Sequence, residues 1–319
     1  MNQILHEIGL IGIMPVIVLE HAEYAGPLAK ALIDGGLPCA EVTFRTAAAK
    51  DSIACIAKKY PEMLLGAGTV LTVDQVKAAK DAGAKFIVSP GLNPKVVEYC
   101  LKENIPIIPG VATPSEVERA MDHGLEVVKF FPAESNGGVD YLKALAGPFR
   151  ALHFIPTGGI NENNFMSYLS YSRVLACGGS WMVRPDFVAN HRFDEITALT
   201  AHAVQKMLGF SLRHVGINTS SEQEAKNTAS QLTDMFGFLP NDKGGAIFVG
   251  TAFEVIKNKY LGAHGHIAIA TNSVERALAF LQRHNIGIKQ ETKNFVNGKL
   301  QTVYLDVDVA GFAVHLVQL

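Results

Sequence analysis

Hydrophobic and polar positions repeat with one theme along roughly the first 205 residues. Short β-branched runs that end in Gly, Pro, Thr or Ser predict strands, and each is followed by a segment with the apolar spacing of an amphipathic helix. The predicted strands are Pro15–Leu19, Ala40–Phe44, Leu64–Val70, Phe86–Ser89, Pro106–Pro109, Val127–Phe131, His153–Pro156 and Val174–Cys177. The predicted helices include Ala22–Asp34, Ala47–Lys59, Val73–Ala82, Pro94–Lys102, Pro114–Asp122 and Asn163–Leu169, with Thr72 and Thr113 as N-caps.

This order predicts the fold class of residues 1–208. Strict alternation of strands and helices indicates an α/β protein with a parallel sheet, and eight repeats favour a closed (β/α)8 TIM barrel. An open, doubly wound sheet is the alternative. The first strand–helix turn, however, lacks the glycine-rich fingerprint of a dinucleotide-binding fold.

The pattern changes after Lys206, and a short linker is expected at about Met207–Ser211. Residues 209–319 are predicted to form a smaller α+β domain of two βαβββ-like modules, roughly fifty residues each. The first module comprises strands His214–Asn218, Ala246–Val249 and Phe253–Lys257 with helix Ser221–Phe236. The second comprises strands His266–Ala270, Gln301–Val307 and Ala313–Leu319 with helix Val274–His284.

Composition narrows the class of protein. With 48% hydrophobic and 18% charged residues, the chain is typical of a well-packed enzyme, and a net charge of −2 without basic tracts argues against nucleic acid or anionic membrane as partners. The cysteines form no CxxC pair, which predicts free thiols in a reducing cytoplasm. The N-terminus has no basic region typical of a signal peptide, and no apolar run reaches the ~18 residues of a membrane helix.

Charged side chains occupy two of the predicted barrel strands. Alternation along the second strand places Glu41, Thr43 and Arg45 on one face, which we expect to point into the barrel. The sixth strand carries Lys129 among valines and phenylalanines. Burial lowers the pKa of an amine, and a neutral amine attacks a ketone. The alternatives are a structural ion pair on the second strand and a snorkelling lysine on the sixth.

Small residues end three further strands. Thr69 follows Gly66-Ala67-Gly68, where a ligand can approach the backbone closely. Thr157-Gly158-Gly159 and Gly178-Gly179-Ser180 end the seventh and eighth strands. Exposed backbone N–H groups at these two strand ends are typical of a barrel phosphate site.

Seven motifs occur in order between about Ile11 and Gln205: EVTFRT, GAGTVLT, SPGLNP, KFFPAE, GGV, PTGGI and GGSW. Together they resemble the 2-keto-3-deoxy-6-phosphogluconate (KDPG) and 4-hydroxy-2-oxoglutarate (KHG) aldolase family. The resemblance implies that Lys129 forms a Schiff base with pyruvate and that Glu41 is the acid/base. It implies that Arg45 and Thr69 hold the pyruvate carboxylate. The implied phosphate-binding and pocket-lining residues are Gly158, Gly159, Gly179, Ser180, Thr157, Phe131 and Pro90.

The family's activity is cleavage of the phosphorylated 2-keto-3-deoxy sugar acid to pyruvate and glyceraldehyde 3-phosphate. The resemblance also implies a homotrimer and chemistry without a metal or other cofactor. Cleavage of 4-hydroxy-2-oxoglutarate to pyruvate and glyoxylate is a secondary expectation, because that substrate lacks a phosphate. The first strand ends Val18-Leu19-Glu20, without the basic residue of many galactonate-specific relatives, which favours the gluconate substrate. A galactonate-specific aldolase, a sugar-phosphate epimerase and a binding barrel without aldolase activity remain alternatives.

Residues 214–319 resemble the glyoxalase, or vicinal oxygen chelate, superfamily through HVGI, FEVIK, HGHIAIA and FAVHLVQ. Carried over by position, the metal ligands are His214, Glu254, His266 and His315, a set suited to Zn²⁺, Ni²⁺ or Fe²⁺. Relatives usually have a carboxylate where His315 stands, and His264 replaces His266 if the register differs. Either a metal-dependent enzyme acting on a related oxo-acid or a non-catalytic sensing or assembly module fits this domain.

Overall fold

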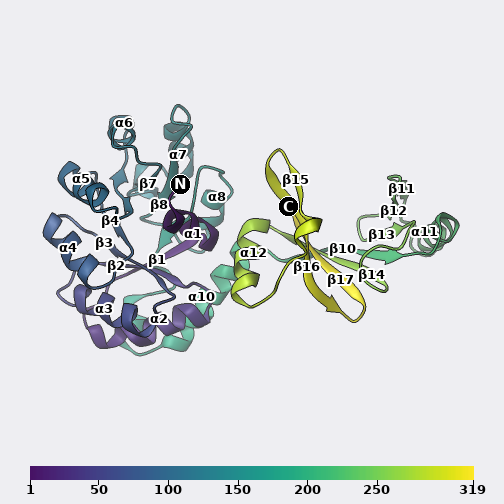
Figure 1. Ribbon diagram of the computed structural model, residues 1–319, viewed down its shortest axis with the longest axis horizontal. Helices are drawn as coiled ribbons and strands as arrows, with labels where there is room; N and C mark the ends of the chain where they lie inside the picture. Colours follow the sequence, from purple (N-terminus) through teal and green to yellow (C-terminus); the bar gives the residue numbers. More distant parts are fainter. The chain divides into compact units, whose positions relative to one another are not determined.

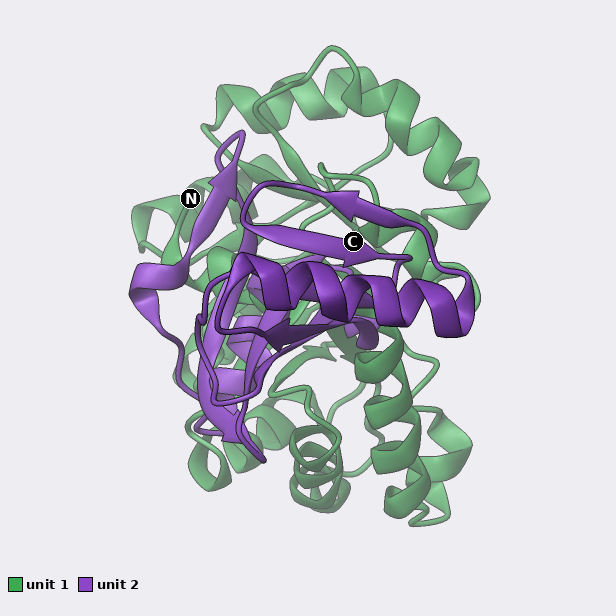
Figure 2. Cartoon of the chain, turned by 90° about the vertical axis from the view of Figure 1, so that its right-hand side faces the viewer, with its two compact units in different colours: residues 1–207 green, residues 208–319 purple.

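The computed structural model describes all 319 residues, and these form two compact units, residues 1–207 and 208–319 (Figure 2). No helix in either unit combines the length and apolar character required to cross a membrane. No disulfide joins the four cysteines; Cys39, Cys100 and Cys177 are buried and Cys55 is half-buried.

The first unit contains nine short strands, and every pairing among them is parallel. They are β1 (Ile13–Ile17), β2 (Cys39–Thr43), β3 (Leu64–Gly68), β4 (Phe86–Val88), β5 (Ile107–Ile108), β6 (Gly110–Val111), β7 (Val127–Phe130), β8 (His153–Pro156) and β9 (Cys177–Gly179). They pair in the orders β5-β4-β3-β2-β1-β9 and β6-β7-β8. Isolated bridges Phe154–Val174 and Thr157–Gly178 join β8 to the β9 segment. The result is a TIM-barrel-like arrangement.

Helices surround these strands, and Figure 1 shows α2 to α6 outside β1 to β4. The helices are α1 (Gln3–Ile11), α2 (Ala25–Asp34), α3 (Ala49–Lys59), α4 (Val73–Asp81), α5 (Pro94–Lys102), α6 (Pro114–Asp122), α7 (Gly138–Ala146), α8 (Phe165–Leu169), α9 (Pro185–Ala189) and α10 (Phe193–Leu208). Every residue of β1, β2 and β3 is buried, as expected where side chains fill the interior and helices cover the outside. Thr72 and Thr113 cap α4 and α6 as predicted, each in a capping box.

Only the seventh predicted barrel strand has the observed bounds; the first, for example, is Ile13–Ile17 and not Pro15–Leu19, and the differences in the fifth, third and eighth follow from the local backbone. The fifth strand is interrupted at Pro109, which has no N–H to donate to a neighbouring strand. The third ends at Gly68 because Thr69 adopts a left-handed φ of 54°. The eighth begins at Cys177, and Val174 contributes only a bridge. The predicted helix at Ala22 also begins as a 3-10 turn, η1 (Ala22–Tyr24).

The second unit is one sheet built from two modules with the same strand order. In the first module β10 (Ser211–Asn218) pairs in parallel with β13 (Phe253–Ile256), followed by antiparallel β12 (Ala246–Val249) and β11 (Pro240–Asp242). In the second, β14 (Gly265–Thr271) pairs in parallel with β17 (Phe312–Gln318), followed by antiparallel β16 (Lys299–Val309) and β15 (Asn294–Val296). Antiparallel pairing of β10 with β14 joins the modules.

Each module therefore contains a strand that the hydrophobic pattern did not predict. All residues of β11 and of β15 are exposed, so these edge strands lack the alternation that marks a half-buried strand. Helix α11 (Glu222–Phe236) packs Ala225, Ala229 and Leu232 on Ile247 and Val255 in the first module. Helix α12 (Val274–Arg283) covers β16 and β17 in the second, and the remaining short helices are η2 (Glu134–Asn136) and η3 (Gln290–Thr292).

Candidate active site and histidine cluster

Lys129 and Glu41 meet inside the barrel. The amine Nζ of Lys129 lies 3.4 Å from Oε1 of Glu41, and their side chains are 6% and 0% exposed. Lys129 is thus a buried lysine and not a snorkelling one. The other carboxylate oxygen, Oε2 of Glu41, is buried without a hydrogen-bond partner. A buried acceptor of this kind is available to a group on a bound molecule.

Strand β3 supplies the space that Glu41 occupies. Gly68 lies beside β2, and a Cβ atom built on it would stand 2.0 Å from Oε1 of Glu41. Thr43, two residues after Glu41, donates its hydroxyl to the carbonyl of Ile17 at 2.9 Å, which ties β2 to β1. The predicted inward face of the second strand is therefore correct for Glu41 and Thr43.

Arg45 and Thr69 come together where β2 and β3 end. Nε of Arg45 donates to Oγ1 of Thr69 at 3.3 Å, and the Arg45 side chain is otherwise exposed. Thr69 holds its left-handed conformation although it is β-branched. Such a conformation costs about 1–3 kcal/mol and is found most often at functional sites. A guanidinium and a hydroxyl placed side by side are chemically able to bind a carboxylate.

The two glycine-rich strand ends also lie together, because Thr157 forms a bridge with Gly178. Gly158 and Gly159 have φ angles of 96° and 81°, which strongly favour glycine. Their N–H groups and that of Ser180 donate no hydrogen bond within the chain. The structure therefore leaves backbone donors available for an anion at this end of the barrel.

The remaining predicted pocket residues surround the same end. The ring of Phe131 lies with its centroid 5.1 Å from Nζ of Lys129. The hydroxyl of Thr157 is buried and unpaired, whereas Pro90 is half-buried and packs its carbonyl close to Gly110. The sequence interpretation gave Gly68 a role in the approach of a ligand and not in making room for Glu41, and it did not single out Gly110; a glycine inside a strand is the signal that could have found both.

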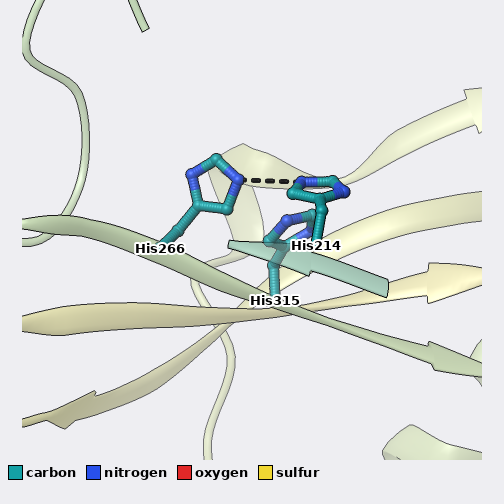
Figure 3. Close-up of side chains that lie close together, drawn as sticks. All are labelled: His214, His266 and His315. Carbon is teal, nitrogen blue, oxygen red and sulfur yellow. Dashed lines mark hydrogen bonds between the residues drawn. The ribbon is translucent and has the colours of Figure 1, made fainter. Parts of the chain in front are cut away.

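In the second unit, His214, Glu254, His266 and His315 converge on one face of the sheet. Nε2 of His214 lies 3.0 Å from Oε2 of Glu254 and 3.0 Å from Nε2 of His266, and Nε2 of His266 lies 3.2 Å from the same oxygen. Figure 3 shows the three imidazoles grouped together, and their ligand atoms all lie within 4.8 Å of one another. His264, the alternative to His266, instead packs against Phe312.

Strand register and two small residues create this cluster. Glu254 and His266 both pair with Gly216, and His214 and His315 both pair with Ala268. These four side chains thus form two adjacent rows on one face. A Cβ on Gly216 would stand 2.2 Å from the His266 ring, so glycine leaves the room that this ring fills.

The charge states of the cluster suit cation binding. Burial opposes ionisation of Glu254, but hydrogen bonds with His214 and His266 outweigh it and lower the pKa of the carboxyl to about 2. Burial, together with the neighbouring His266 and His214, lowers the pKa of His315 to about 3. Both ring nitrogens of His315 are buried without a partner. At neutral pH this leaves a carboxylate and a neutral imidazole, which are the ligand forms of these side chains.

Parallel strands in a TIM-barrel-like unit, with a buried lysine and carboxylate inside it, define an α/β-barrel enzyme. The chain belongs to the KDPG and KHG aldolase family, whose model matches residues 4–199. A 2-dehydro-3-deoxy-phosphogluconate aldolase of Treponema pallidum is 53% identical over 193 residues, which cover 60% of this chain and 92% of the relative. The KHG/KDPG aldolase of Escherichia coli is 48% identical, covering 60% and 91%.

A solved structure shows the same similarity. The crystal structure of the KDPG aldolase of Legionella pneumophila, with pyruvate captured as a covalent carbinolamine, is 40% identical with a TM-score of 0.62. It covers 63% of this chain and 98% of the other. The family match ends at residue 199, so the histidine cluster lies outside the part that defines the family.

Proposed function

We propose that this protein is a Schiff-base aldolase that cleaves 2-dehydro-3-deoxy-6-phosphogluconate to pyruvate and glyceraldehyde 3-phosphate. The observation that carries the proposal is the buried contact between Lys129 and Glu41. The carboxylate clamp of Arg45 and Thr69 and the unpaired N–H groups of Gly158 and Gly159 support an acidic substrate with a distal phosphate.

Each catalytic step follows from these groups. Lys129 attacks the C2 ketone and water leaves, so that a cationic imine forms and draws electrons from the C3–C4 bond. Glu41 accepts the proton of the C4 hydroxyl, directly or through water, as that bond breaks and glyceraldehyde 3-phosphate forms. The enamine is then protonated at C3 with the help of Glu41. Hydrolysis of the imine releases pyruvate and restores Lys129.

The phosphate and carboxylate ends of the substrate are held by different chemistry. Gly158, Gly159, Gly179 and Ser180 offer backbone groups and a hydroxyl to the phosphate. Thr157, Phe131 and Pro90 line the part of the pocket that takes the carbon chain of the substrate between its two charged ends. A substrate without the phosphate, such as 4-hydroxy-2-oxoglutarate, uses only part of this binding energy and is expected to be cleaved less efficiently. We also infer a homotrimer, as the family resemblance implies.

Borohydride reduction in the presence of pyruvate tests the covalent step. We expect the intact mass to rise by one reduced pyruvyl group and peptide mapping to place it on Lys129. Lys129→Met should form no adduct, whereas the matched variant of an exposed lysine, Lys143→Met, should react like the wild type. Absence of an adduct on wild-type protein that cleaves the substrate would refute the mechanism. An adduct-free, inactive wild type would favour a binding barrel.

We infer a second site, for a divalent cation, at His214, Glu254, His266 and His315. Ligand atoms around one cation are about 2.8–3.6 Å apart, from octahedral to tetrahedral geometry, when each bond is about 2.0–2.2 Å. The three closest atoms here are 3.0–3.2 Å apart, and His315 has no other partner. The two-module sheet supports the glyoxalase-like assignment. A bound cation would polarise an oxygen ligand as a Lewis acid.

Elemental analysis of the purified full chain tests this site. About one Zn²⁺, Ni²⁺ or Fe²⁺ per chain is expected, and a His214→Gln/Glu254→Gln variant should lose it. Gly216→Ala keeps all four ligands but displaces the His266 ring, so it should also weaken binding. Gly287→Ala, whose added Cβ meets only Asp306 at 3.5 Å, is the matched control. A metal-free wild type after reconstitution would favour a non-catalytic sensing or assembly module.

A further inference from the structure

A pocket of about 380 Å³ opens beside the histidine cluster and lies within the second unit. Its wall includes Glu254, His266 and His315 from the cluster, whereas His214 does not line it. The volume is at the small end of ligand-binding pockets in proteins, which are about 300–1,000 Å³. The open side of the cluster therefore faces a space suited to a small molecule.

The pocket contains one cation whose charge is not neutralised. Lys243, in the turn between β11 and β12, lines the pocket and forms no ion pair. The neighbouring Asp242 is bound instead by Lys257, whose Nζ lies 2.8 Å from Oδ2. The turn is held by a hydrogen bond from the N–H of Lys243 to the carbonyl of Ala246 at 2.9 Å. Lys243 thus presents a positive charge from an ordered turn.

Hydroxyl donors face the same pocket. Tyr304 pairs with His315 across β16 and β17, and their rings stack with centroids 4.7 Å apart. Tyr260 lies edge-on to Tyr304, and Asn218 binds both the N–H and the carbonyl of Tyr260. The hydroxyls of Tyr304, Tyr260 and Thr302 make no hydrogen bond within the chain. The one carboxylate of the wall, Glu254, is already held by two imidazoles.

We propose that this pocket binds a small organic acid whose carboxylate is recognised by Lys243 and the Tyr304 hydroxyl, with an adjacent oxygen directed at the histidine cluster. The position of the adjacent oxygen depends on the proposed metal site, whereas recognition of the carboxylate does not. Ala246, Phe248 and Ile256 line the rest and suit a short carbon chain.

A carboxylate fits this wall better than a phosphate does. The turn contains Gly244 and Gly245, but their N–H groups already donate to Oδ1 of Asp242 and to the carbonyl of Lys243. It therefore has no free backbone cradle like that of the barrel's Gly158 and Gly159. A single ammonium group matches the single charge of a carboxylate.

Calorimetric titration with oxalate tests the proposal on the full chain. Oxalate has no ketone and cannot form a Schiff base, and an Arg45→Ala background removes the carboxylate clamp of the barrel. In that background, Lys243→Ala should raise the Kd for oxalate about tenfold, as expected for a hydrogen bond to a charged group. Lys259→Ala, an exposed lysine outside the pocket, should leave the Kd unchanged. Metal content is measured before and after the titration.

Each result decides between the two proposals. Bound metal with a Kd indifferent to Lys243→Ala overturns the acid site and leaves the metal site standing. Lys243-dependent oxalate binding by metal-free protein supports the acid site and overturns the metal site. If the protein contains no metal and its oxalate binding does not depend on Lys243, both proposals are overturned. Inorganic phosphate that binds more tightly than oxalate through Lys243 overturns the assignment to a carboxylate.

Discussion

Nζ of Lys129 lies 3.4 Å from Oε1 of Glu41, although 88 positions separate the two residues in the chain. Neither side chain has appreciable contact with solvent. Such burial would penalise the charged form of either group in the absence of the other. This geometry places an amine and a carboxyl group in contact inside the barrel.

Replacing Glu41 with Gln should keep the shape of the site but remove its proton acceptor. We expect kcat to fall by about 10²–10⁴, the usual contribution of general acid–base catalysis. Steady-state cleavage assays measure the loss, and borohydride trapping should still modify Lys129 with pyruvate. A variant with wild-type kcat would exclude Glu41 as the base.

Replacing Gly68 with Ala should displace the Glu41 carboxylate without changing any predicted catalytic residue. The added Cβ would stand 2.0 Å from Oε1, so either the carboxylate or strand β3 must move. We expect a loss of kcat of at least about tenfold, because small displacements of a catalytic group are costly. Gly91→Ala, which has no atom within 4 Å of the added Cβ, should retain activity. Equal activities in both variants would contradict the assignment.

Replacing Arg45 with Lys should weaken the hold on the substrate carboxylate, because an ammonium group cannot reproduce the planar guanidinium fork. The carboxylate is present in substrate and transition state alike, so KM should rise about tenfold while kcat changes less. Arg150→Lys, at an exposed position, is the control. A fall in kcat at constant KM would instead give Arg45 a part in the chemical steps.

A chelator should separate the two sites. The aldolase steps use an iminium ion as the electron sink, so metal removal should leave kcat and KM for the sugar acid unchanged. Loss of a ligand present at about 100 times its Kd removes about 2.7 kcal/mol of stabilisation. We therefore expect chelation to lower the melting temperature of the second unit. Scanning calorimetry measures this change. Metal-dependent cleavage would contradict the Schiff-base proposal.

Stability of helix α6 should depend on pH through Glu116. Burial opposes its ionisation, but hydrogen bonds from Ala112 and Thr113 outweigh this and lower the pKa of the carboxyl below 4.5. A lowered pKa stabilises the fold above the unfolded value, and that contribution is lost as the pH falls through the folded value. Glu116→Gln should cost about 0.3–1 kcal/mol at pH 7 and progressively less below pH 4.5. Urea unfolding at pH 7 and below pH 4.5 measures the difference in free energy of unfolding between wild type and variant. A difference that does not change with pH would contradict the lowered pKa of Glu116.

Periodicity alone located most of the elements near the candidate sites. The alternation around Glu41 predicted its inward face, and Thr113 predicted the start of a helix, because both signals depend on neighbours in the chain. The edge strands β11 and β15 were missed because an exposed strand has no apolar alternation. Pro109 interrupts a strand for a local reason, the missing N–H, that the sequence already contained.

The ordered motifs, the family and the candidate residues could all be recognised from the amino-acid sequence. Which of these residues lie in contact became clear only from the folded chain. Lys129 was compatible with a snorkelling side chain until closure of the barrel placed it against Glu41. His214, Glu254, His266 and His315 were separate until strand pairing through Gly216 and Ala268 brought them onto one face. The reason is physical: strand register and glycine-sized gaps depend on partners distant in the chain, which local patterns do not encode.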